Sequence, residues 1–174
     1  MKKVISLFLS LAMLLSIVSV VDFSAYADVQ TGSCGDNVTY SLDTETGVLT
    51  ISGTGDMYSY GPFYENTNIK SVIIENGVTS IGDGVFQGCT SLRSVTIPDS
   101  VTSIDSSAFS SCTSLTSVTI PNSVTSIGYG VFQDCTSLSS VTIPNSATSI
   151  GDSAFYNTAY YNDESNWDNG VLYI

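Results

Sequence analysis

The chain has 174 residues, a formal net charge of −12 and no histidine, and only 11% of its residues are charged. A globular protein carries about 25% charged residues on average, so hydroxyl and amide side chains must supply much of the solubility here. Nucleic acids and anionic membranes are bound through clusters of Lys and Arg, which this sequence lacks, so its composition argues against both partners. Without histidine, Ser-His-Asp or Cys-His catalysis and histidine-containing metal sites are excluded.

Residues 1–27 read as a secretory signal peptide. Two lysines precede an apolar run, and "AYA" at 25–27 supplies a cleavage site of the A-x-A type. The mature protein is then expected to begin near Asp28, to be secreted or held at the cell surface, and to make no further membrane insertion. The alternative is an uncleaved anchor helix, because the apolar run from 4 to 21 approaches the length that spans a bilayer.

Residues 28–62 form an N-terminal capping segment in this interpretation. The stretch "NVTYSLDTETGVLTISG" contains two strand-like runs on either side of the turn "DTETG". Runs of this kind around a short turn predict an antiparallel hairpin, which can cover the apolar end of whatever follows it.

Residues 63–158 repeat with a period of 23, so that positions one period apart carry the same type of residue. Such regular columns indicate a stack of similar structural units. The aromatic column consists of Phe63, Phe86, Phe109, Phe132 and Phe155. The aliphatic columns are Ile69, Leu92, Leu115 and Leu138; Val72, Val95, Val118 and Val141; Ile74, Ile97, Ile120 and Ile143; and Ile81, Ile104, Ile127 and Ile150.

Each 23-residue unit has the same internal order of elements. The stretch "LRSVTIP" alternates apolar and polar residues, as a half-buried strand does, and its proline starts a turn. A second short strand, "VTSI", follows the turn, and the Phe and Cys of "GDGVFQGC" are three residues apart, which suits one helical or 3₁₀ turn.

One unit alone cannot bury enough apolar surface to be stable. Its seven apolar side chains contribute roughly 10 to 20 kcal/mol on burial, whereas ordering the backbone costs about 1 to 2 kcal/mol per residue. Stacking lets each unit cover the next one, with strands about 4.7 to 4.9 Å apart. The sequence therefore predicts a mostly β repeat solenoid of 23-residue coils with a parallel sheet and short helical turns.

The periodicity stops after residue 158. The segment 159–174 ends with "WDNGVLYI", in which Asn169-Gly170 favours a hairpin turn followed by an apolar strand. We therefore expect 159–174 to form an irregular C-terminal hairpin segment. Because an apolar strand is unusual at a native terminus, we also expect that the chain is truncated.

The repeat pattern "IGxxxFxxCxSLxSVTIPxSVTSIG" resembles the BspA-type leucine-rich repeats of exported bacterial surface proteins. The segment "GSCGDNVTYSLDTETGVLTISGTGDM" also resembles the region that often precedes such repeats. This resemblance covers nearly the whole mature chain and rests on five columns in register. It implies a curved stack with one parallel sheet on its concave side, and a role in protein binding or adhesion at the cell surface.

The three cysteines of the repeat are predicted to be buried free thiols. Cys89, Cys112 and Cys135 form a column, and a column points its thiols the same way, so they neither converge on a metal nor bring their Cβ atoms together for a disulfide. Cys34 has no partner position in the repeat, and its redox state stays open.

We assign no catalytic residue, no metal and no cofactor. Asp83 and Asp152 share a column but lie three coils apart, too far for paired acid-base chemistry. The oxygen-rich stretches "DTETG" and "NDESNWDNG" could attract Ca²⁺, although neither keeps the twelve-residue loop pattern of a calcium site.

The outward side of the "SVTIP" strands remains as a candidate binding surface. Its residues are Lys70, Ser71, Ile73, Arg93, Ser94, Thr96, Ser117, Thr119, Ser140 and Thr142. Aromatic side chains make good contact anchors, and several gather near the ends of the array. The candidates are Tyr58, Tyr60, Tyr160, Tyr161 and Trp167. Their alternative role is to seal the ends of the core.

These features favour a non-enzymatic exported module that binds a protein or a surface glycan. The alternative is a structural spacer that presents a missing C-terminal domain.

Overall fold

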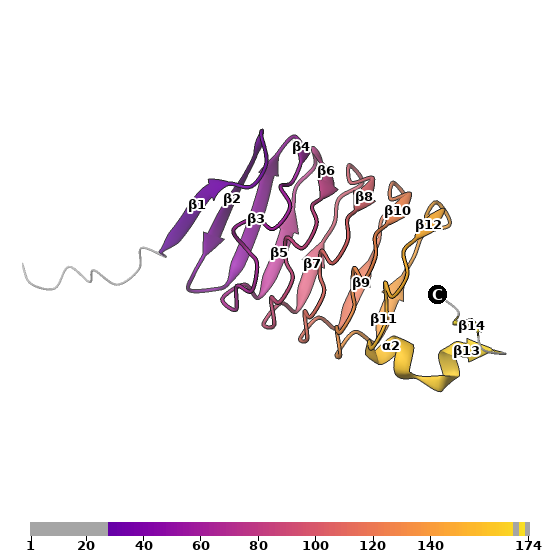
Figure 1. Ribbon diagram of the computed structural model, residues 1–174. Helices are drawn as coiled ribbons and strands as arrows, with labels where there is room; N and C mark the ends of the chain where they lie inside the picture. Colours follow the sequence, from indigo (N-terminus) through magenta and orange to yellow (C-terminus); the bar gives the residue numbers. More distant parts are fainter. Residues whose placement is uncertain (1–27, 169–170, 173–174) are drawn as a thin grey trace, which may run out of the picture.

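The computed structural model describes residues 28–168 and 171–172, and the expected signal peptide, 1–27, lies outside this range. The described chain forms one stack of coils, with the N-terminal and C-terminal segments at opposite ends (Figure 1). No helix among the described residues is long and apolar enough to cross a lipid bilayer.

The N-terminal strands close one end of the stack. Strands β1 (Val29–Ser33), β2 (Val38–Asp43) and β3 (Val48–Gly53) pair in antiparallel order, which confirms the predicted hairpin around "DTETG". In the turn, the Asp43 carboxylate accepts hydrogen bonds from the backbone N–H groups of Glu45 and Thr46. Strand β3 then pairs in parallel with the first strand of the array, β5 (Ser71–Ile74), so the hairpin covers the first coil.

Four coils follow, each contributing one strand to each of two parallel faces, and β4 of the N-terminal segment adds a fifth strand to the second face. The first face contains β5, β7 (Ser94–Thr96), β9 (Ser117–Thr119) and β11 (Ser140–Thr142). The second face contains β4 (Gly55–Asp56), β6 (Val78–Ile81), β8 (Ser103–Ile104), β10 (Ser126–Ile127) and β12 (Ser149–Ile150). Paired residues such as Ser71 with Ser94 and Ile104 with Ile127 are 23 positions apart, which confirms the predicted solenoid and its period.

The first face is not the single continuous sheet that the sequence led us to expect. Its strands pair as β5 with β7 and as β9 with β11, but no ladder joins β7 to β9 within the described chain. The second face, in contrast, is one five-stranded sheet from β4 to β12. We call the interruption between β7 and β9 the seam.

The third side of each coil is a tight turn that carries the Phe and Cys columns. Hydrogen bonds of the i to i+3 kind close it, for example from the N–H of Cys89 to the carbonyl of Phe86 (3.1 Å). This is the 3₁₀-type geometry expected for the unit, confined to single turns. Bonds between coils reinforce it, such as the 2.9 Å bond from Phe86 N–H to the Ala108 carbonyl.

The five phenylalanines form a continuous stack inside the solenoid. Successive ring centroids lie 5.5, 5.2, 5.5 and 5.6 Å apart, and the planes of neighbouring rings differ by no more than 17°. Tyr40 packs edge-on against the first ring at 4.9 Å and so covers the N-terminal end of the stack. Aliphatic columns surround the rings, and Ile150, the last member of one column, is 40% exposed, since no further coil within the described residues covers it.

All four cysteines are buried and free. Each thiol of the repeat column donates a hydrogen bond to a phenylalanine carbonyl of the preceding coil, over 3.0 Å from Cys89, 3.2 Å from Cys112 and 3.1 Å from Cys135. Burial raises the pKa of Cys34 to about 11 and that of Cys89 to about 12. The thiols therefore stay protonated and pack as small apolar groups.

The repeat ends at Thr158, which occupies the next position of the cysteine column. Its hydroxyl accepts the N–H of Tyr161 (3.0 Å) and caps the short helix α2 (Ala159–Asn162). A 3₁₀ helix, η1 (Glu164–Asn166), follows, and β13 (Trp167–Asp168) pairs in antiparallel order with β14 (Val171–Leu172). The expected turn at Asn169-Gly170 lies outside the described residues.

Candidate functional site

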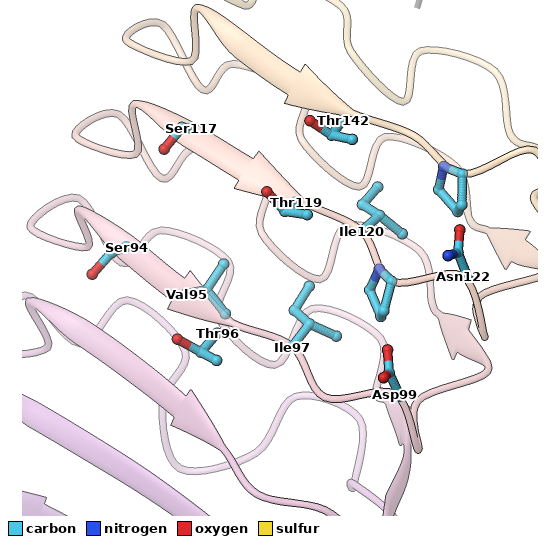
Figure 2. Close-up of a pocket in the computed structure, with 12 residues that line it drawn as sticks. Ser94, Val95, Thr96, Ile97, Asp99, Ser117, Thr119, Ile120, Asn122 and Thr142 are labelled. Atoms are coloured by element: carbon cyan, nitrogen blue, oxygen red, sulfur yellow. The ribbon is translucent and has the colours of Figure 1, made fainter.

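The first face presents two rows of hydroxyl side chains to solvent (Figure 2). Because side chains alternate along a strand, the valine of each "SVT" points inward while the serine and the threonine point outward. Ser94, Ser117 and Ser140 form one exposed row, and Thr96, Thr119 and Thr142 form the other. In β5 the corresponding residues are Ser71, which is half-buried, and Ile73, which is 42% exposed.

The two basic side chains of the array lie at one end of this face. Lys70 and Arg93 are exposed and directly precede β5 and β7. They are therefore separated from the other ends of the same strands, where the chain turns.

The surface over these strands and over the turns that follow them is hollowed in two adjoining places. The first is a hollow of about 590 Å³ along β7, β9 and the end of β11. Figure 2 shows residues that line it, among them Ser94, Thr96, Thr119 and Thr142. A second hollow of about 660 Å³ lies beside it, over the ends of β5 and β7. The two share Thr96, Ile97 and Asp99, so we treat them as one feature, the strand-end groove.

The floor of the strand-end groove is apolar and its edge is polar. Ile73, which is 42% exposed, and the half-buried Val95 and Pro121 supply apolar surface, with the buried Ile97 and Ile120 beneath them. Val95 is half-buried although its neighbours Val72 and Val118 are buried. The prolines preset the turn that ends each strand, so their rings lie beside the last strand residues.

The seam leaves backbone groups without partners at the groove. The N–H of Ile120 donates to the Thr142 carbonyl at 3.0 Å, but the equivalent N–H of Ile97 makes no such bond to Thr119 within the described chain. At the other end of the strands, the N–H of Arg93 bonds to the Lys70 carbonyl (2.9 Å), whereas Thr116, one coil later, has no corresponding bond among the described residues.

The charged groups of the strand-end groove are all acidic. Glu75 and Asp99 are exposed, and neither carboxylate makes a side-chain hydrogen bond or an ion pair with any described residue. Lys70 and Arg93 are not among the lining residues, so the groove itself contains no positive charge that neutralises these two carboxylates.

The predicted aromatic anchors divide into two groups at the two ends of the molecule. Tyr58 and Tyr60 are 47% and 61% exposed, and the Tyr58 hydroxyl donates to the Asp36 carboxylate at 2.8 Å. Tyr161 packs edge-on against Trp167 with centroids 5.0 Å apart, and the Trp167 indole N–H donates to the Tyr161 carbonyl. Tyr160, also half-buried, donates its backbone N–H to the Leu138 carbonyl, so this second group lies against the last coil.

The carboxylates of the two oxygen-rich stretches serve as turn acceptors. Asp43 accepts two backbone N–H bonds, and Asp163 accepts the N–H and hydroxyl of Ser165. Bonds from the Thr46 backbone and side chain lower the pKa of Asp43, and bonds from the Ser165 side chain and backbone lower that of Asp163. No group of three potential metal ligands occurs in the described part of the chain.

The structure thus brings only part of the predicted surface together. Ile73, Ser94, Thr96, Ser117, Thr119 and Thr142 line the groove, while Lys70, Ser71, Arg93 and Ser140 lie outside it. Ile97 and Ile120, which the sequence assigned to a core column, are buried as predicted. Sequence reasoning missed Glu75 and Asp99 as surface candidates, because it considered the strands and not the turns after them. The proline that ends each strand was the available signal.

Comparison with known proteins places these features in context. A family model described as "BspA type Leucine rich repeat region" matches residues 59–165 in six copies. No functionally curated protein shows a significant match to the sequence.

Solved structures show the same architecture. A leucine-rich repeat protein of T. pallidum is 29% identical with a TM-score of 0.60, and the match covers 70% of this chain and 64% of that one. A leucine-rich repeat protein from Bacteroides ovatus ATCC 8483 is 36% identical with a TM-score of 0.53, and the match covers 60% of this chain and 28% of that one. The present chain thus corresponds to less than two thirds of the length of either protein.

Proposed function

This chain belongs to the BspA-type leucine-rich repeat family, and we propose that it is an exported binding module which attaches to a protein or a surface glycan at the bacterial cell surface. The role is adhesion or recognition without catalysis. The signal-like residues 1–27 support export.

The observation that carries this proposal is the exposed hydroxyl surface of the first face. Rows of Ser and Thr repeat from coil to coil without an intervening charge and offer many donors and acceptors in fixed positions. A partner would be held by many weak hydrogen bonds with little electrostatic steering. Solvent-facing hydroxyl groups of this kind suit a protein surface or a polysaccharide.

Binding should be measured on arrays of purified surface proteins and glycans. The test variant Thr96→Arg/Thr119→Arg places bulky cations on the first face, and the control Thr102→Arg/Thr125→Arg makes the same change at exposed threonines of the second face. We expect saturable binding that the first variant loses and the control keeps. Absence of binding above background, or equal loss in both variants, would contradict the proposal.

A second candidate is a spacer that holds another domain away from the cell. The greater length of the two solved relatives favours it, as does the 40% exposed Ile150 on the last coil, where a further unit could pack. In that case downstream coding sequence should contain a wall-binding or catalytic domain, and the isolated chain should bind nothing on the arrays.

A further inference from the structure

The strand-end groove combines three properties that none of the hydroxyl rows has. It has an apolar floor at Ile73, Val95 and Pro121, unpaired backbone groups along the seam, and two carboxylates without partners, Glu75 and Asp99. We propose that this groove binds an extended polypeptide segment in which Lys or Arg residues alternate with aliphatic ones. The inference rests on the proposed binding function and names its site and its partner's chemistry.

Charge complementarity selects a basic partner. The groove carries two negative charges and no positive one, within a chain whose net charge is −12. A segment with several carboxylates would be repelled both by the groove and by the protein's overall field. Lysine or arginine side chains can instead pair with Glu75 and Asp99, which lie on neighbouring coils beyond the strand ends.

The seam favours a polypeptide over a glycan. An N–H or carbonyl that lies at a surface without a partner gains from a ligand that brings a complementary amide. Ile97 and Thr119 line the groove and lack the bond that joins Ile120 to Thr142 in the next pair of coils. A peptide backbone supplies both donors and acceptors at regular spacing, and the aliphatic side chains of the peptide can cover Ile73, Val95 and Pro121.

The first test uses a capped heptapeptide of alternating Lys and Leu as the probe, with a matched peptide in which Gln replaces Lys. Binding to the full chain is followed by fluorescence anisotropy. We expect the Lys peptide to bind saturably and the Gln peptide to bind about tenfold more weakly, since two ion pairs of up to about 1 kcal/mol each are lost. Equal binding of both peptides would overturn the charge argument.

The second test separates the groove from the protein's general charge. Glu75→Gln/Asp99→Asn neutralises the groove, and Asp152→Asn/Glu164→Gln neutralises two exposed carboxylates elsewhere, so both variants gain the same charge. Asparagine already occupies the column of Asp99 at Asn76, Asn122 and Asn145, so this change suits the turn. We expect about a tenfold loss of affinity in the first variant and little change in the second. Equal losses would reduce the effect to net charge and overturn the proposed site.

Ile73→Thr tests how much apolar contact contributes to peptide binding. Threonine suits this position, because the other three coils carry Thr96, Thr119 and Thr142 in the same column. Loss of contact with this 42% exposed side chain should lower the affinity for the Lys-Leu peptide about threefold. The circular dichroism spectrum and the urea midpoint should stay the same. Unchanged affinity would count against an apolar floor.

Failure of this inference differs from failure of the proposed function. One outcome would overturn the basic-peptide groove and leave the binding function intact. In that outcome the chain binds a neutral protein or a chitin oligosaccharide, Thr96→Arg/Thr119→Arg abolishes this binding, and the Lys peptide does not bind. If neither the peptide nor any array probe binds, both are overturned.

Discussion

Phe109 lies at the centre of the aromatic stack, between rings 5.2 and 5.5 Å away, and is fully buried. Phe109→Ala should destabilise the protein by about 3 to 5 kcal/mol, because it removes a large apolar side chain and leaves a cavity between two coils. Urea unfolding measures this. The control Tyr129→Ala truncates an aromatic residue that is 54% exposed and should change the stability by less than about 0.5 kcal/mol. An unchanged midpoint for the Phe109 variant would show that the stack does not support the fold.

The buried thiols make stability depend on alkaline pH. An unfolded cysteine has a pKa of about 8.5, whereas burial raises the pKa of Cys34 to about 11 and of Cys89 to about 12 in the folded chain. Above pH 8.5 the unfolded chain loses thiol protons that the folded chain retains. Stability should therefore be full below about pH 8.5 and fall as the pH rises toward 11 to 12.

Urea midpoints between pH 7 and 11 test this dependence. A Cys89→Ala variant should show a shallower decline, since one raised group has been removed. The thiol reagent DTNB should leave all four cysteines unmodified at pH 8 until urea is added. Rapid modification of the native protein would contradict their burial.

Each coil also contains left-handed backbone positions that only some coils fill with glycine. Gly88 has φ +74°, and Ser111 adopts φ +60° one repeat later. Ser111→Gly should stabilise the fold by roughly 0.5 to 1 kcal/mol, because it relieves a conformation that side chains disfavour, while Gly88→Ser should destabilise it. Thermal unfolding measures both changes, and shifts of the same sign in the two variants would refute the explanation.

At the scale of the strand, the seam predicts unequal protection of backbone amides. The N–H of Thr116 should exchange with deuterium faster than those of Arg93 and Ser139, which hold the equivalent positions and are hydrogen-bonded to the preceding coil. The N–H of Ile97 should likewise exchange faster than that of Ile120. Equal protection along either set would mean that β7 and β9 pair in solution.

The seam also shows where sequence reasoning reached its limit. The order of elements, the period, the buried columns and the N-terminal hairpin followed from periodicity, since apolar residues at fixed positions must face a common core. The strands β7, β9 and β11 all read "SVT", so nothing in them distinguishes a paired neighbour from an unpaired one. The groove was missed for another reason, because the search for a surface considered the strands and left out the turns that their prolines begin.

At the scale of the molecule, each coil contacts mainly its neighbours, so whole coils should be removable. Deleting residues 101–123 joins Ser100 to Val124 and restores the sequence "SVTSI" that already stands there. We expect a folded, cooperative protein with a lower urea midpoint, because one interface is lost. Deleting only 101–112 should abolish cooperative unfolding, since the remaining columns fall out of register. A folded product from the half-coil deletion would contradict the stacking model.

The ends of the stack were only partly predictable. The hairpin at 38–53 and the loss of the repeat after 158 were visible in the sequence, and β13 and β14 do pair. The helix α2 was not foreseen, since four residues give too short a pattern to recognise. It forms because Thr158 replaces the cysteine of the column and caps the helix through its hydroxyl.

The near-identity of successive coils affects how the number of coils can change during evolution. DNA that encodes near-identical 23-residue units is prone to misaligned recombination, which adds or removes an integral number of units. Because the strands of the second face keep the same register after each period, such events would lengthen or shorten the array without disturbing either cap. The reach of the protein would then change in fixed steps, while the N-terminal hairpin and the C-terminal helix stay unchanged.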